Sequence, residues 1–212
     1  MKKTNIILNT DLYGITAEEY SRGRSNIEVV KKMIEADIKV IQYREKDKKN
    51  LYKYQECLEI RKLTADAGVI FIVNDDIDIA MAVEADGVHI GQEDMPISAV
   101  RSLIPDNMII GLSTHSVEQA QVALKQGADY IGVGPIFATN TKKDVCDPVG
   151  FTYLEYVAEN IDLPFVAIGG IKRHNIKEVQ KRGAKCICLV TEIVEAEDIV
   201  QRVAEIRDIL AR

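Results

Sequence analysis

The segment GVGPIFATNTKKD occupies residues 132–144 and follows a short apolar run at residues 129–133. The apolar run predicts a buried strand, and the glycine–proline pair at 134–135 ends it. The loop that follows places two threonine hydroxyls and two lysine ammonium groups within residues 139–143. Hydroxyls donate hydrogen bonds to phosphate or carboxylate oxygens and lysine supplies charge, so this composition suits an anionic ligand. An ordinary solvated loop has the same composition, so the other strand ends must separate the two interpretations.

Similar apolar runs recur along the chain, and each is followed by a segment with helical periodicity. The predicted strands are residues 11–16, 38–43, 69–73, 87–90, 108–112, 130–133, 165–168 and 186–190. The predicted helices are residues 25–36, 50–67, 77–84, 97–103, 116–126, 152–159, 175–182 and 197–210. The strands are continuous apolar runs, as expected when both faces of a sheet are buried. Eight β then α units predict an α/β fold of the (β/α)8 TIM-barrel type.

Composition limits the number of domains and the class of partner. No composition break or flexible linker divides the 212 residues, which predicts a single domain over residues 1–212 with residues 1–10 as an N-terminal extension. The 27 basic and 33 acidic side chains give a net charge of −6, which argues against a nucleic-acid partner.

Hydropathy and cysteine content address location. No apolar run reaches membrane-spanning length, and the apolar patch in MKKTNIILNT is too short for a signal peptide. The four cysteines include no C-x-x-C pair, which argues against a zinc site. We therefore expect a cytoplasmic protein with no membrane partner. The sequence leaves open whether copies of the chain associate into a homo-oligomer.

Side chains that suit a phosphate ligand follow the predicted strands, where barrels of this kind carry their chemistry. After the second strand, Gln42, Arg44 and Lys46 point the same way in an extended segment. Arg44 can contact phosphate oxygens with two nitrogens, and Lys46 adds a second charge. After the seventh strand, the glycine pair at 169–170 lets the backbone approach a ligand closely, although a tight turn would also use glycine.

Two aspartates are candidate magnesium ligands. Asp75 follows the third predicted strand and Asp94 the fourth, and magnesium prefers hard oxygen ligands such as carboxylates and phosphates. Each aspartate alone could instead cap a helix. Their position on adjacent strands beside a basic cluster favours the metal. His89 and His115 have no evident third ligand nearby, so we interpret them as structural or orienting groups.

Several motifs together resemble the thiamine phosphate synthase family along nearly the whole chain. The matching stretches are LYGIT, QYREKD, ND at 74–75, ADGVHIGQED, GLSTHS, GADYIGVGPIFATNTKKD and AIGGI. The resemblance implies a TIM-barrel catalytic domain with transferase activity. It implies that the enzyme joins a hydroxymethylpyrimidine diphosphate to a thiazole phosphate, or its carboxylated form, and releases pyrophosphate with the help of Mg²⁺ through a dissociative route.

The resemblance also assigns roles to residues. It implies that the pyrimidine diphosphate is bound by Gln42, Tyr43, Arg44, Glu45, Lys46, Asn74, Ser113 and Lys142, of which Arg44, Lys46, Ser113 and Lys142 act in catalysis. It implies that Mg²⁺ is bound by Asp75 and Asp94. It implies that the thiazole phosphate is bound by Thr139, Asn140, Thr141, Gly170, Val190 and Thr191. Thr191 departs from the family, which usually has serine there; threonine keeps the hydroxyl and adds a methyl group.

Two other functions are compatible with the same fold. Thiazole tautomerase relatives share the barrel and transfer a proton, but they tend to lack the diphosphate and metal residues that are present here. A non-catalytic sensor of a phosphate ligand would not need Asp75 and Asp94 to bind metal. The dependence of diphosphate affinity on magnesium distinguishes the sensor from the transferase.

Overall fold

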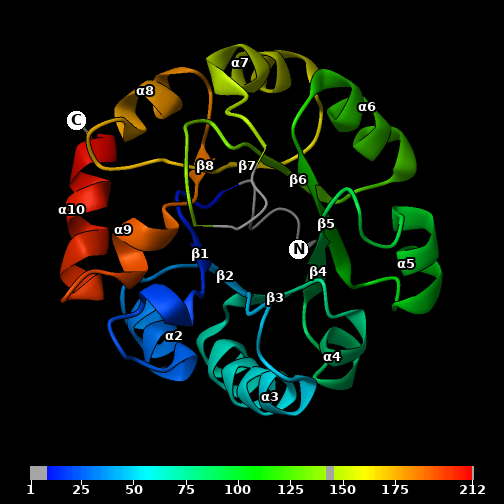
Figure 1. The fold of residues 1–212 in the computed structure, drawn as a ribbon, viewed down its shortest axis with the longest axis vertical. Helices are drawn as coiled ribbons and strands as arrows, with labels where there is room; N and C mark the ends of the chain where they lie inside the picture. The colour runs from blue at the N-terminus through cyan, green and yellow to red at the C-terminus, as the bar shows by residue number, and fades with distance from the viewer. Residues whose placement is uncertain (1–8, 142–145, 212) are drawn as a thin grey trace.

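The computed structural model describes residues 9–141 and 146–211, which form the expected (β/α)8 barrel (Figure 1). Eight parallel strands are hydrogen-bonded to one another in chain order. They are β1 (Tyr13–Ile15), β2 (Val40–Tyr43), β3 (Ile70–Asn74), β4 (Gly87–Ile90), β5 (Ile109–Thr114), β6 (Tyr130–Val133), β7 (Phe165–Ala167) and β8 (Cys186–Ile187). The predicted fold class is therefore confirmed.

The barrel closes between its first and last strands. Leu12 and Ile187 form a parallel bridge, and the Ile187 amide donates a 2.9 Å hydrogen bond to the Asp11 carbonyl. Arg207, on the last helix α10 (Ile199–Ala211), donates to the Asp11 carboxylate at 2.7 Å and to the Ala36 carbonyl at 2.6 Å. The first and last βα units are thus joined by main-chain and side-chain contacts.

Helices surround the strands on the outside of the barrel (Figure 1). They are α2 (Asn26–Glu35), α3 (Asn50–Ala67), α4 (Ile77–Ala82), α5 (Ile97–Leu103), α6 (Val117–Gln126), α7 (Gly150–Asn160), α8 (Ile176–Lys181), α9 (Val190–Val194) and α10. Ser25 begins α2 with a capping box, as expected from its hydroxyl. Gly68 and Gly127 end α3 and α6 at φ of 66° and 80°, a region that glycine occupies without strain.

Several bounds differ by a few residues from the prediction, and three local differences concern the site. A 3-10 helix, η1 (Glu18–Tyr20), lies between β1 and α2. Strand β8 stops at Ile187, so Val190, predicted to end the strand, begins the short helix α9 together with Thr191. Strand β5 continues to Thr114, which places Ser113 within the strand and not in the loop after it.

Apolar side chains fill two separate cores. The larger core lies between the strands and the helices. The smaller one fills the barrel interior and consists of Tyr13, Ile15, Val40, Ile70, Ile72, Ile109, Tyr130, Val166, Cys186 and Cys188. The expectation of buried thiols at Cys186 and Cys188 is confirmed. Two tyrosines thus bring hydroxyl groups into an otherwise apolar interior, where each hydroxyl needs a hydrogen-bonding partner.

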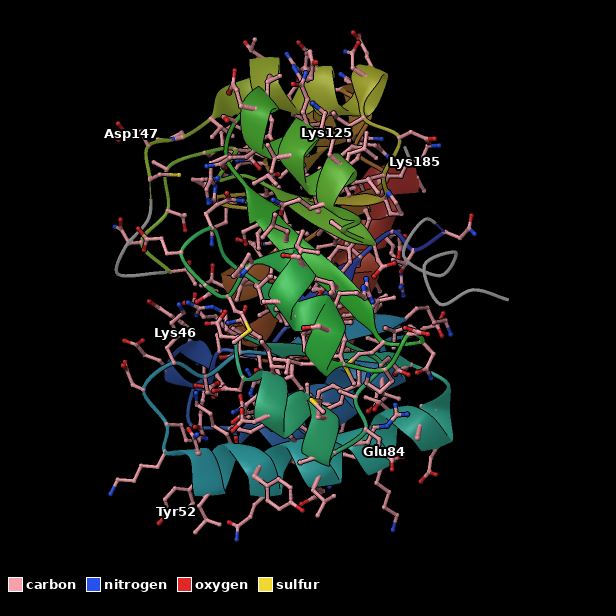
Figure 2. The ribbon with its side chains drawn as sticks, turned by 90° about the vertical axis from the view of Figure 1, so that its right-hand side faces the viewer. Lys46, Tyr52, Glu84, Lys125, Asp147 and Lys185 are labelled. Carbon is pink, nitrogen blue, oxygen red and sulfur yellow. The ribbon has the colours of Figure 1, made fainter. Side chains whose placement is uncertain are left out.

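The two ends of the barrel are distinct in side view (Figure 2). Lys46, which follows β2, and Asp147, which precedes α7, project from one end. Glu84 and Lys185, which precede β4 and β8, lie toward the other end. The first end is the carboxyl end of the strands, where the candidate residues gather. Within the described part of the chain, no helix is long and apolar enough to cross a membrane.

Candidate active site

The segment after β2 carries a half-buried guanidinium at the carboxyl end of the barrel. The Arg44 amide donates a 2.9 Å hydrogen bond to the Thr16 hydroxyl, which fixes the main chain at this point. The Nε atom of Arg44 is buried and has no hydrogen-bond partner among the described residues. Burial lowers the pKa of this guanidinium, and the nearby Asp75 carboxylate opposes that effect. Because buried N–H groups are rarely left unpaired, this nitrogen indicates a site for an anionic ligand.

The side chains on either side of Arg44 contact neighbouring elements of the barrel. The Tyr43 hydroxyl donates a 2.7 Å hydrogen bond to Glu56 on α3, and Glu45 accepts one of 3.0 Å from the Glu18 amide. Lys48 contacts Glu18 at 2.5 Å and Glu56 at 2.6 Å. These contacts anchor the loop to η1 and α3. The side chains of Tyr43 and Glu45, expected to bind the diphosphate, are engaged in these contacts with α3 and η1.

Gln42 also lies deeper than the sequence indicated. The residue is 3% exposed, and its side chain donates a 3.0 Å hydrogen bond to the Tyr13 hydroxyl inside the barrel. Its side-chain amide therefore contacts the polar groups inside the barrel.

A basic and an acidic group meet at the ends of β2 and β3. Lys46 Nζ lies 3.3 Å from Asp75 Oδ2. Asp75 has a φ of 61°, a strained conformation for a residue with a side chain, and strain of this kind is common at functional sites. Burial raises the pKa of Asp75, and the neighbouring negative charge of Asp94 raises it further. Asp94 Oδ2 accepts a 2.6 Å hydrogen bond from the Gly91 amide, which fixes its carboxylate.

The structure argues against the alternative that these two aspartates are helix caps. The residue at the N-cap of α4 is Asp76, which pairs with Lys53 at 2.8 Å, and the N-cap of α5 is Pro96. The described residues contain no cluster of three or more potential metal-ligating side chains. Two carboxylates that repel each other beside an anion site nevertheless fit magnesium, which commonly binds one or two protein carboxylates and completes its shell with phosphate oxygens and water.

Ser113 and Asn74 lie at the same end of the sheet. Asn74 is the last residue of β3 and pairs in register with His89. The Ser113 hydroxyl lies 3.0 Å from His89 Nε2, and the Ser113 carbonyl accepts a 2.6 Å hydrogen bond from Gln92. His89 Nδ1 lies 2.9 Å from the Tyr130 hydroxyl. The interpretation of His89 as an orienting group agrees with these two contacts.

The threonine loop after β6 approaches η1. The hydroxyls of Thr139 and Thr141 lie 3.0 Å apart, and the Asn140 carbonyl accepts a 3.5 Å hydrogen bond from Tyr20. Asn140 is thus held through its main chain. Lys142, expected to act on the diphosphate, lies outside the described residues.

Glycines after β7 let this loop pack closely. A Cβ on Gly170 would lie 2.6 Å from the Ala138 carbonyl oxygen, and one on Gly169 would lie 2.4 Å from Pro135 Cα. Both glycines also have positive φ values, 96° at Gly169 and 64° at Gly170. The glycine pair therefore permits the close contact between two loops.

Lys172 is a candidate that the sequence analysis did not name. Its Nζ donates a 2.6 Å hydrogen bond to the Thr191 hydroxyl and lies 3.7 Å from Glu192. The residue follows the glycine pair by two positions, in the loop that TIM barrels often use to bind phosphate. That position after the glycine pair was the signal available in the sequence, because the loop after the seventh strand often binds phosphate in this fold.

Comparisons with known proteins show the family to which the chain belongs. A family model described as "Thiamine monophosphate synthase" matches residues 12–193. The thiamine-phosphate synthase of Pelotomaculum thermopropionicum is 68% identical over 206 residues, which cover 97% of this chain and 94% of that protein. The thiamine-phosphate synthase of Lawsonia intracellularis is 56% identical over 200 residues, covering 94% and 92%.

A solved structure is similar at the level of the fold and of the sequence. The thiamine phosphate pyrophosphorylase from Pyrococcus furiosus superposes with a TM-score of 0.88 and 36% identity, covering 98% of each chain. The sequence match, the fold and the residues at the strand ends lead to one assignment: this chain belongs to the thiamine monophosphate synthase family.

Proposed function

We propose that the protein is a cytoplasmic transferase that makes thiamine phosphate. It joins 4-amino-2-methyl-5-(diphosphooxymethyl)pyrimidine to 4-methyl-5-(2-phosphooxyethyl)thiazole, or to the carboxylated form of that thiazole, and releases pyrophosphate. The observation that carries the proposal is the buried, unpaired Nε of Arg44 beside Lys46 and the two aspartates. A diphosphate supplies the oxygens that this guanidinium lacks, and its charge suits both cations.

The leaving group determines what these residues do. In a dissociative route, the C–O bond breaks first and its electron pair goes to the diphosphate, while the aminopyrimidine ring stabilises the resulting methylene cation. Arg44 and Lys46 stabilise the negative charge that grows on the diphosphate, and Ser113 donates a hydrogen bond to it. Mg²⁺ held by Asp75 and Asp94 would supply further positive charge toward the same oxygens.

Formation of the C–N bond requires that the thiazole nitrogen be positioned, and it does not require a base to activate that nitrogen. The thiazole nitrogen carries a lone pair and attacks the methylene carbon without losing a proton, so no nucleophile–base pair is required. In this proposal, the hydroxyls of Thr139 and Thr141, the main chain at Gly170 and the start of α9 bind the thiazole phosphate. Lys172, which contacts the Thr191 hydroxyl at 2.6 Å, provides a cation there.

One assay tests this proposal against its alternatives. Pyrophosphate release is measured with both substrates, with each substrate alone, and with or without magnesium. We expect release only when both substrates and magnesium are present. Proton exchange on the thiazole without pyrophosphate release would support a tautomerase instead. Diphosphate binding that is independent of magnesium, with no turnover, would support a sensor.

A further inference from the structure

A row of polar side chains crosses the apolar interior of the barrel. Gln42 Nε2 lies 3.0 Å from the Tyr13 hydroxyl, and that hydroxyl lies 2.8 Å from the Tyr130 hydroxyl. Tyr130 lies 2.9 Å from His89 Nδ1, and His89 Nε2 lies 3.0 Å from the Ser113 hydroxyl. The row begins in the buried interior and ends at the barrel mouth, where the diphosphate is proposed to bind.

The first group sets the direction of the hydrogens along this row. The Gln42 nitrogen can only donate, so the Tyr13 oxygen accepts from it. Within the described structure, the other hydrogen-bonding partner of the Tyr13 hydroxyl is Tyr130, so Tyr13 donates to the Tyr130 oxygen. Tyr130 must then donate its own hydrogen to His89 Nδ1. Burial raises the pKa of both tyrosines, so both keep these hydrogens at neutral pH.

The same count of hydrogens fixes the state of the imidazole. An imidazolium would donate at both nitrogens, and one of the two buried tyrosine hydrogens would then have no acceptor. A neutral ring that accepts at Nδ1 carries its hydrogen on Nε2 and donates it to the Ser113 oxygen. The hydroxyl hydrogen of Ser113 is then directed away from His89.

We infer that Gln42, Tyr13, Tyr130 and His89 form a directional hydrogen-bond chain that turns the Ser113 hydroxyl into a donor toward the substrate diphosphate. The four residues are positioning residues and act through Ser113. The opposite direction would aim the serine hydrogen at the histidine and present only lone pairs to an anion. This inference rests on the proposed function for the identity of the anion.

Backbone geometry leaves space for this chain. A Cβ on Gly111 would lie 2.2 Å from Tyr130 Cζ and 2.5 Å from His89 Nδ1, so only glycine permits the contact between these rings. The two ring centroids are 5.4 Å apart. A glycine in the middle of a strand weakens the strand, and here it makes room for two polar rings in the barrel.

The direction of the chain can be measured without turnover. Long-range proton–nitrogen NMR spectra of histidine-labelled protein without substrates report the tautomer of each ring, and the His115→Gln and His174→Gln variants assign the signals. We expect neutral His89 with its hydrogen on Nε2. A hydrogen on Nδ1, or on both nitrogens, would overturn the inference. The result does not depend on activity, so a failure of the proposed function is recognised separately by the pyrophosphate-release assay.

A double-mutant cycle tests whether the chain acts through the serine. Binding of inorganic pyrophosphate is measured by calorimetry in the presence of magnesium. We expect Ser113→Ala to weaken binding about 10-fold or more, and Tyr130→Phe to weaken it by about 3- to 10-fold, as for the loss of a hydrogen bond to a charged group. In the Ser113→Ala background, Tyr130→Phe should change binding less than about 2-fold, because the two residues act on one interaction.

A matched variant controls for the loss of a buried tyrosine hydroxyl. Tyr153 donates a 2.6 Å hydrogen bond to Thr114, next to Ser113 in sequence but outside the chain. Tyr153→Phe should leave pyrophosphate affinity and the His89 tautomer as in the wild type. Additive losses for Tyr130→Phe and Ser113→Ala would mean that Tyr130 acts through general stability, and the inference would be wrong.

Discussion

The Lys172 ammonium donates a 2.6 Å hydrogen bond to the Thr191 hydroxyl and so joins the loops that follow β7 and β8. The Glu192 carboxylate lies 3.7 Å from the same nitrogen. The Thr191 hydroxyl is therefore oriented by a cation. A phosphate bound beside these two residues would contact both the Thr191 hydroxyl and the Lys172 ammonium.

Removal of this cation should affect affinity more than turnover. We expect Lys172→Met to raise the KM for the thiazole phosphate by about 10-fold and to leave kcat nearly unchanged, because the phosphate keeps its charge throughout the reaction and is bound equally in ground and transition states. Steady-state kinetics with each substrate varied separately measures this split. Lys185→Met, which removes an exposed lysine toward the opposite end of the barrel (Figure 2), is the control. An unchanged KM for the thiazole phosphate would exclude Lys172 from its site.

Neutralising Asp75 should stabilise the metal-free protein. Burial and the nearby Asp94 raise the pKa of Asp75, so its charged form is disfavoured in the folded state. A raised folded-state pKa means that stability is lost as pH rises from the unfolded value, about 3.9, through the folded value. At pH 7 without magnesium, Asp75→Asn should raise the Tm by about 2–4 °C, and this gain should vanish below pH 4.

Magnesium should reverse the order of the Tm values of the wild type and Asp75→Asn. With magnesium and pyrophosphate, the Tm of the wild type should rise by mass action, and the Tm of Asp75→Asn should rise less. Asp78→Asn changes an exposed carboxylate on α4 and should behave as the wild type in both conditions. Equal stabilisation of all three proteins by magnesium would contradict the assignment of Asp75 as a metal ligand.

Two glycines inside the barrel should respond differently to alanine. Gly111→Ala places a Cβ 2.2 Å from Tyr130 Cζ, whereas Gly132→Ala meets its nearest atom, His89 Cε1, at 3.5 Å. We expect Gly111→Ala to destabilise the fold by about 1–3 kcal/mol, as overpacked cores do, and Gly132→Ala to be tolerated. Urea denaturation of both variants measures the difference in the free energy of unfolding. Similar values for the two would mean that Tyr130 and His89 move aside readily.

The ion cluster under the β2 loop predicts a pH dependence of stability. Burial raises the pKa of Glu56, but hydrogen bonds from Lys48, Tyr43 and Asn26 together hold it below its usual value. A depressed pKa contributes stability above the unfolded value, about 4.3, and that stability is lost as pH falls through the folded value.

Glu56→Gln should therefore lower stability at pH 7 and flatten the loss of stability below pH 5. Thermal unfolding between pH 3 and pH 7 measures both effects. The control is Glu84→Gln, an exposed change toward the amino end of the strands (Figure 2). If Glu56→Gln keeps the wild-type slope, the cluster does not contribute through this carboxylate.

Local sequence patterns predicted the regular elements well. The bounds predicted for α3, β4, α5 and β6 agree with the structure. The end of α3 is marked by Gly68, a glycine in the left-handed conformation directly after the helix. Short elements were missed. The helix α9 is five residues long and η1 is three, which is too short for a helical period to show.

Alternation along an extended segment predicted that Gln42, Arg44 and Lys46 share one side, but it did not predict the partners of the residues between them. Tyr43 and Glu45 contact Glu56 and Glu18, which lie on other elements of the chain, and only the three-dimensional structure shows these contacts. The contact between Tyr13 and Tyr130 joins residues 117 positions apart. No local pattern encodes such a pair, because the closure of the barrel brings the two strands to the same layer.

The bridge between Leu12 and Ile187 also constrains how the chain folds during synthesis. As the nascent chain leaves the ribosome, β1 can pair with β2 early, but the other edge of β1 has no neighbour until residue 187 has been made. Until then the growing sheet is open, and the amides and carbonyls along that edge can pair with strands of other chains. The last contact to form also spans most of the sequence, so it carries a high contact order and should slow the final folding step.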